Sequence, residues 1–355
     1  MKHEPIISIR EGAIVDSQGK KRIFQGVTIS PYSKEFPIPS ISQADAFFAT
    51  LQKHNTTLLR WQILWEDIEG EAPDQYNEAY LADLRTLLKK AEEAGILVFL
   101  EPVMKDWSSS LGGYGAPAWT VPLASIDEAL DNKQKQTMMY SLFWAGNKLA
   151  PNTLVEGDTI QDYLQEHYIA AMKHTARRVK DCKTVVGFGI MAEGQVGDEK
   201  ALELFPLSFE NDCLKPFQKK FIAAFQKKHS HYLFLAEAMC TGEYSTWKFS
   251  PTYNNHEAHA LQKEGGVIPD VDGEASKVIT LLTMEPPQKL LSVFLSKDKL
   301  KKQFQESIKK TLGGGNSVMV EFPTSQGLEC VQEVVQEEGL SYFVNIAMAE
   351  SPVRV

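Results

Sequence analysis

Acidic residues follow several apolar runs of the sequence, each where a strand would end. If the runs are neighbouring parallel strands of a barrel, their carboxyl groups meet at one rim. Like charges gathered there raise the free energy unless a function or a cation holds them. Each acid alone could instead cap a helix, pair with a lysine or lie in an exposed loop. The five acids are Glu66, Glu101, Glu193, Glu237 and Glu321.

A single arginine interrupts the strand-like run "TLLRWQIL". An unpaired charge inside an apolar strand is costly, so Arg60 is predicted to have a carboxylate partner at the barrel mouth. Such a pair could keep a catalytic acid ionised, or it could be purely structural.

Paired carboxylates together with many aromatic residues suggest carbohydrate chemistry. A glycosidic bond is cleaved by one acid that protonates the leaving oxygen and a second that attacks the anomeric carbon or activates water. The chain has six tryptophans, whose faces could stack on sugar rings. Because most tryptophans are core residues, only one or two of them are expected in a cleft.

Apolar strand-like runs alternate with amphipathic helices along the whole chain. "YLADLRTLLKKAEEAG" leads into "ILVFLEP", and "IQDYLQEHYIAAMKHTARRVKD" leads into "TVVGFGIMAE". Repeated helix and buried strand predict a parallel sheet covered by helices. Seven or eight strands over 355 residues favour an α/β fold, a (β/α)8 TIM barrel forming a single domain over residues 1–355. A doubly wound open sheet is the rival, although no Gly-rich phosphate turn follows "GVTIS".

Two segments are predicted to lie outside the regular barrel. Residues 108–160 are expected to form a loop or insertion at the barrel mouth, and residues 265–298 a lid or insertion. The second segment is apolar and rich in Pro and Gly, and plain packing against the barrel is the alternative for it.

Composition limits the classes of partner. The formal net charge of −9 argues against nucleic-acid binding. No run is long and apolar enough to span a bilayer, and the N-terminus does not resemble a signal peptide. We therefore expect a cytoplasmic protein, or one exported without such a signal. Four scattered cysteines predict neither a disulfide framework nor a zinc site.

No cofactor and no metal are expected. A metal-dependent barrel enzyme is a weaker alternative, because two histidine pairs have spacings that could ligate zinc. These pairs are His229 with His231 and His256 with His259.

The chain resembles glycoside hydrolase family 5, in the branch of microbial glucosylceramidases, steryl-β-glucosidases and endoglycoceramidase-like enzymes. "LLRWQILWEDIEG" is similar to that branch's second strand region, and "GGYGAPAWT" to its Gly-Asp-Gly-Ala-Pro-x-Trp loop. "LFWAGNKLAPN" followed by "IQDYLQEHYIAAMKHTARRV" is the most specific match, since neither barrel geometry nor catalysis requires those words.

The resemblance implies roles for individual residues. Glu193 falls on the acid/base glutamate, Glu321 on the nucleophile and Arg60 on the arginine that steadies it. Retention of configuration would place the two carboxyl groups about 5 Å apart. The remaining substrate-binding candidates are Trp65, Glu66, Asp106, Trp107, Trp119, Tyr253, Asn254 and Asn345.

Several family residues are replaced around the site of the −1 sugar. The His-Gln-Asp after the third strand is Val103-Met104-Lys105, and the Asn before the acid/base is Ala192, followed by Gly194 in place of Pro. The sixth-strand His is Thr252, the family's Tyr falls on Asn254 beside Tyr253, and the eighth-strand Trp is Asn345. Pro323 stands in place of a Gly after the nucleophile motif.

Two hypotheses follow. The first is a retaining β-glycosidase with an atypical −1 subsite that hydrolyses a glucoside or glycolipid, with membrane-surface contact through the glycolipid. The alternative is a catalytically impaired pseudo-glycosidase that binds a glycan, a glycolipid or a protein through the old cleft.

Overall fold

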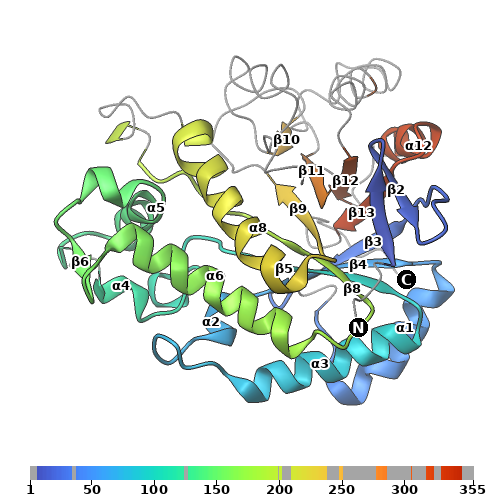
Figure 1. The fold of residues 1–355 in the computed structure, drawn as a ribbon, viewed down its shortest axis with the longest axis horizontal. Helices are drawn as coiled ribbons and strands as arrows, with labels where there is room; N and C mark the ends of the chain where they lie inside the picture. The colour runs from blue at the N-terminus through green and yellow to red at the C-terminus, as the bar shows by residue number, and fades with distance from the viewer. Residues whose placement is uncertain are drawn as a thin grey trace.

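The computed structural model describes residues 6–33, 37–123, 127–198, 200–201, 209–237, 248–250, 277–285, 305, 317–323 and 329–345. These residues form a barrel of parallel strands with helices on its outside (Figure 1). Strand β3 (Gln25–Ile29) is hydrogen-bonded to β4 (Leu58–Ile63) and to β13 (Ser341–Asn345). The ring closes through a pairing between β9 (Leu233–Glu237) and β11 (Val278–Glu285). The predicted TIM barrel is therefore confirmed, and the open doubly wound sheet is wrong.

Eight strands make up the ring in the described residues, and every neighbouring pair is parallel. In ring order they are β3 (Gln25–Ile29), β4 (Leu58–Ile63), β5 (Leu97–Pro102), β8 (Val185–Gly189), β9 (Leu233–Glu237), β11 (Val278–Glu285), β12 (Ser317–Pro323) and β13 (Ser341–Asn345).

Other strands lie outside the ring. Strand β10 (Lys248–Ser250) pairs antiparallel with β11. Two hairpins complete the described strands, one of β1 (Ile7–Arg10) with β2 (Ala13–Asp16), and one of β6 (Leu154–Val155) with β7 (Asp158–Thr159).

Helices cover the outside of the ring, and α3, α6 and α8 lie in order along one side of it (Figure 1). The described helices are η1 (Ile41–Gln43), α1 (Ala44–Lys53), α2 (Trp65–Ile68), α3 (Glu78–Glu93), η2 (Ser109–Leu111), α4 (Thr120–Leu123), α5 (Asn132–Leu149), α6 (Ile160–Arg178), η3 (Phe209–Leu214), α8 (Lys215–His229) and α12 (Glu329–Glu337). Among these described helices, none is both long and apolar enough to cross a membrane.

Helix α3 shows how local sequence sets these elements. Asn77 caps its first turn by accepting a hydrogen bond of 3.1 Å from the backbone N–H of Tyr80. Leu81, Leu84 and Leu88 recur at helical spacing and are buried against the barrel. Gly95 follows with φ of 71°, a left-handed turn that sends the chain directly into β5.

The segment between β5 and β8 carries more than one helix. It contains η2, α4, α5, the β6–β7 hairpin and α6, and the predicted insertion over residues 108–160 falls within it. Most of the predicted lid over residues 265–298 lies outside the described residues. Its described part, β11, is a barrel strand and not a lid, because "VITLLTME" is a β-branched apolar run that pairs on both sides.

The barrel interior is apolar at one level and charged at the next. Leu58, Phe99 and Met319 belong to one buried interior cluster. Side chains two positions along a strand point to the same face, so the next inward residues on β4, β5 and β12 are Arg60, Glu101 and Glu321. An apolar floor therefore lies beneath a layer of buried charges.

We predict that Gly187→Ala destabilises the barrel. A Cβ atom there would lie 2.2 Å from the carbonyl oxygen of Leu233 and 2.5 Å from Phe99 Cε1. Overpacking of this kind costs about 1–3 kcal/mol. Urea unfolding of wild type and variant measures the loss.

Gly95→Ala is the matched control, because nothing lies within 4 Å of the added Cβ and only the positive φ opposes it. Its expected cost is about 1–2 kcal/mol, from backbone conformation alone. Equal unfolding midpoints for Gly187→Ala and wild type would contradict the packing described for β8.

Candidate active site

Arg60 is the centre of a buried ionic cluster at the carboxyl end of the barrel. Its Nε donates to Glu101 Oε2, and its terminal guanidinium N–H donates to Glu321 Oε2. The side chains of Arg60, Glu101 and Glu321 are 2%, 0% and 1% exposed. Arg60 thus has two carboxylate partners, Glu101 and Glu321, where the sequence predicted one.

Glu321 is held from both of its oxygens. Arg60 binds Oε2, and the Thr28 hydroxyl donates a hydrogen bond of 2.5 Å to Oε1. Two donors on a buried carboxylate fix its rotamer and favour its charged form. An ionised carboxyl group in a fixed position is what a nucleophile at a sugar carbon requires.

Glu101 is placed differently from Glu321. Burial is the main cause that raises the pKa of Glu101, while the charge and hydrogen bond of Arg60 act in the opposite direction. The negative charges of Glu321 and Glu193 raise the pKa further. Glu193 therefore lies within electrostatic reach of the buried cluster, at the same end of the barrel.

Glu193 follows the end of β8 and is 39% exposed, in contrast to Glu321. Its backbone is positioned by hydrogen bonds of Ala192 with Pro102 and Met104 on the neighbouring β5 segment. Its φ of 56° is left-handed, which is uncommon for a residue with a side chain. Such conformations concentrate at functional sites, where the surrounding structure maintains them.

Lys105 Nζ lies 3.5 Å from Oε2 of Glu193, and the Tyr114 hydroxyl lies within electrostatic reach of the same carboxylate. Burial, and then the charge of Glu193, raise the pKa of Tyr114, so its hydroxyl remains a donor. The exposed Tyr32 stacks on Tyr114 with ring centroids 4.0 Å apart.

The loop that carries Lys105 and Tyr114 is fixed by predicted site residues. Glu66 accepts hydrogen bonds from the Gly115 N–H at 2.8 Å and the Ser109 hydroxyl at 2.6 Å. Asp106 accepts from Gln195 at 2.8 Å and from Lys133 at 3.2 Å. Partial burial opposes these bonds, which nevertheless lower the pKa of Asp106. Both acids support the loop around Glu193.

The predicted tryptophan platforms are not all available to a ligand. Trp65 and Trp107 are 1% and 0% exposed, so neither can stack on a sugar in this structure, and that expectation for them is corrected. Trp107 donates to Thr120, and Trp65 donates to Glu69. Trp119 is partly buried, and its N–H donates to the backbone oxygen of Glu69 at 2.7 Å.

The side chains of three further candidate residues lie outside the described part of the structure. Tyr253 and Asn254 lie outside the described residues. Asn345 ends β13 in register with Thr28 on β3, which puts its backbone at the level of the buried cluster. Its side chain is likewise outside the described part of the chain.

One group of potential metal ligands occurs among the described residues, formed by Glu69, Asp74 and His167. The carboxylate of Glu69 already accepts from Trp65 at 2.7 Å, from the Asp74 N–H at 2.6 Å and from His167 Nδ1 at 2.9 Å. This group is explained as packing around Trp65. Of the histidine pairs, His229 is buried and contacts Tyr232, and His256 and His259 lie outside the described residues.

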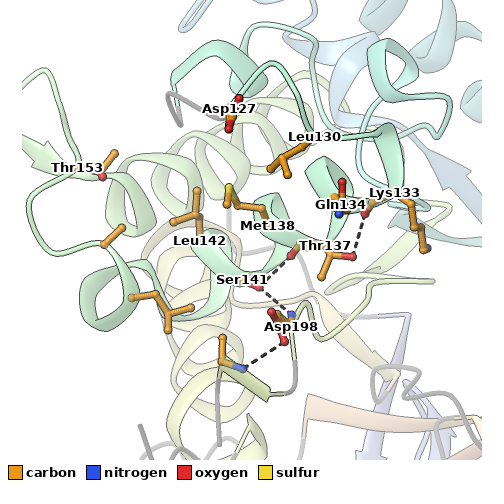
Figure 2. A pocket seen from close by; sticks show the side chains of 13 residues that line it. Asp127, Leu130, Lys133, Gln134, Thr137, Met138, Ser141, Leu142, Thr153 and Asp198 are labelled. Atoms are coloured by element: carbon orange, nitrogen blue, oxygen red, sulfur yellow. Dashed lines mark hydrogen bonds between the residues drawn. The ribbon is translucent and has the colours of Figure 1, made fainter. Parts of the chain in front are cut away.

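A groove of about 640 Å³ lies along α5 (Figure 2). Leu130, Met138 and Leu142 form apolar walls, and Ser141 accepts a hydrogen bond from the Asp198 N–H at its edge. None of the residues around Arg60 lines it. One of its lining residues, Lys133, also binds Asp106.

Sequence reasoning missed several residues that the structure brings to the site. Thr28 is one of many hydroxyl residues and has no motif. Lys105 and Tyr114 stand where the family has acidic residues, so their sequence signal was a departure from the pattern. Glu101 was recognised as a strand-end acid, but its sharing of Arg60 depends on the register between β4 and β5.

Comparisons with known proteins agree with this architecture. No protein-family model matches the chain. It is 30% identical to a glucosylceramidase from Aspergillus fumigatus, over 44% of this chain and 25% of that protein. It is 23% identical to an ergosteryl-beta-glucosidase from Saccharomyces cerevisiae, over 55% of this chain and 36% of that protein. The chain thus spans a quarter to about a third of the length of these relatives.

The structural comparison covers almost the whole chain. The lactosyl-enzyme intermediate of endo-glycoceramidase II from Rhodococcus sp. superposes with a TM-score of 0.67 and 17% identity, covering 95% of this chain and 76% of that chain. The two proteins share the TIM-barrel fold. The predicted resemblance to microbial glucosylceramidases, steryl-glucosidases and endoglycoceramidases is confirmed.

We predict that Arg60→Met strongly destabilises the protein. The change leaves two buried carboxyl groups without this cation, and breaking a buried pair costs about 3–5 kcal/mol. Urea unfolding at about pH 7 measures the loss. The deficit is expected to shrink at about pH 5, because removing the cation raises the folded-state pKa of the carboxyl groups that it served, and a carboxyl group whose pKa is raised by folding stabilises the fold when protonated and loses that contribution as pH rises.

Arg85→Met is the matched control. Arg85 also pairs with a carboxylate, Asp181, but both side chains are nearly half exposed. Water replaces such a partner, so this variant is expected to lose far less stability than Arg60→Met. Similar losses in the two variants would contradict the buried cluster.

Proposed function

We propose that the protein is a retaining β-glycosidase that hydrolyses a glucoside or a glycolipid. One observation carries the proposal. A buried carboxylate held by two donors, Glu321, lies at the same barrel end as a partly exposed acid, Glu193, that ends the β8 segment. The names of the relatives and of the structural neighbour support the substrate class.

The two environments suit two different roles. Glu321 attacks the anomeric carbon, and the bond to the aglycone oxygen breaks as Glu193 donates a proton to that oxygen. In the second step Glu193, now ionised, removes a proton from water, which attacks the glycosyl ester and releases Glu321. Glu193 gives one proton to the aglycone oxygen and recovers one from the attacking water, and its exposure lets that water reach it, whereas Glu321 is shielded.

The −1 subsite is expected to be atypical. Ala192 precedes the acid/base and is buried in a small apolar cluster with Leu64 and Val103. In the segment 103–105, which replaces the family's His-Gln-Asp, Met104 is also buried and Lys105 is a cation next to Glu193. Hydrogen bonds to the sugar 2-hydroxyl contribute several kcal/mol in typical enzymes, so a site built this way recognises the sugar by other contacts.

Substitution of either glutamate should impair turnover, to a different extent for each. Glu321→Gln removes the nucleophile and is expected to lose all measurable hydrolysis of aryl β-glucosides and glucosylceramide. Glu193→Gln is expected to lower kcat/KM about 10²–10⁴-fold, the usual contribution of a general acid–base group. The loss should be smaller for aryl groups that leave readily, because they need little protonation.

Glu78→Gln is the control, since Glu78 is half exposed and pairs with Arg178 and His174. It should retain wild-type kinetics. Tight glycoside binding without turnover in wild type would instead identify a pseudo-glycosidase, and the hydrolase assignment would be withdrawn.

Retention predicts a covalent intermediate. Incubation with a 2-fluoroglucoside that has a good leaving group should add one fluoroglucosyl unit, and peptide mass spectrometry should locate it on Glu321. Proton NMR of the first product should show the β-anomer. An initial α-anomer, or a label on another residue, would contradict the assigned nucleophile.

A further inference from the structure

One oxygen of the buried cluster has no partner among the described residues. Glu101 Oε2 accepts from Arg60 Nε, but Oε1 is fully buried without a hydrogen bond. The space beside it is closed by β8, since a Cβ atom on Gly189 would lie 2.1 Å from Glu101 Cγ and 2.5 Å from Oε1. A carboxylate oxygen enclosed in this way would carry negative charge without a donor.

The charges around Glu101 also disfavour its ionisation. One guanidinium group faces two carboxyl groups, and all three side chains are 2% exposed or less. Glu193 contributes a further negative charge from the segment after β8, and Tyr168 on α6 lies within electrostatic reach of Glu101. Ionising both Glu101 and Glu321 would place two negative charges beside Arg60 in a dry interior, which is costly.

Hydrogen bonding decides which carboxyl group keeps the proton. Glu321 accepts from Arg60 and Thr28, one donor on each oxygen. Glu101 accepts from Arg60 on one oxygen only, within the described part of the chain. Donors stabilise the charged form, so Glu321 is the better site for the negative charge.

We propose that Glu101 holds a proton at neutral pH and thereby leaves the charge of Arg60 to Glu321. Glu101 is then a positioning residue that acts through Arg60 and does not touch the substrate. The raised pKa of Glu101, caused first by burial, agrees with this assignment. The role in catalysis rests on the proposed function, whereas the location of the proton does not.

Carbon-13 NMR of the resting protein tests the proposal directly. Glutamate carboxyl carbons are labelled, and the signals of Glu101 and Glu321 are assigned by correlation to their own backbone atoms. The pH is then raised from acidic to mildly alkaline. At neutral pH the Glu101 carbon is expected at the protonated position and the Glu321 carbon at the ionised position. An ionised Glu101, or a proton on Glu321, would overturn the proposal.

Glu101→Gln provides a second measurement, because glutamine is neutral and still offers an oxygen to Arg60 Nε. With an aryl β-glucoside, the acid limb of its pH–rate profile should not move, because replacing a protonated acid with a neutral amide leaves the charge of the cluster unchanged. A displaced acid limb would show that Glu101 carries charge in the wild-type protein and would overturn the proposal.

Glu101→Ala is the comparison variant, since it removes the acceptor as well as the acid and should weaken both activity and stability. If no glycoside is turned over by wild type, the proposed function fails, and the NMR titration still decides where the proton resides.

Discussion

The geometry of this site depends on one buried guanidinium group. Arg60 lies between carboxyl groups from two other barrel strands, and each of the three side chains is almost completely removed from water. An uncompensated charge at this depth would cost several kcal/mol, so the contacts of Arg60 constrain the strands that carry its partners. The position of Glu321 is therefore a consequence of barrel closure as much as of its own rotamer.

The apolar floor and the charged layer are two aspects of one pattern. Leu58 and Arg60 point inward from β4, as Phe99 and Glu101 do from β5 and Met319 and Glu321 from β12. The apolar level closes the barrel below, which lowers the local dielectric constant and strengthens the ionic contacts above it. Glu193 lies beyond this layer, has a left-handed backbone conformation and is accessible to solvent.

The surroundings of Glu193 differ in kind from those of Glu321. Glu321 is held by residues of neighbouring strands, whereas Glu193 lies near a half-exposed ammonium group, a tyrosine and a loop that is held by Glu66 and Asp106. Surface ion pairs contribute little to stability, so this side of the site can adapt to a ligand. Val103 and Ala192 belong to one small buried cluster against which Tyr114 packs, and the buried Met104 is hydrogen-bonded through its backbone to Ala192.

The sequence by itself determined the barrel, since buried strands and amphipathic helices alternate with a period that local chemistry fixes. It also marked Glu193, Glu321 and Arg60, because a charge at the end of or inside an apolar strand is visible in one dimension. The sharing of Arg60 by two acids, the bond from Thr28 and the burial of Trp65 and Trp107 were decided only by the tertiary structure. They depend on register between strands far apart in the chain, and strand sequence does not encode which neighbour a side chain will meet.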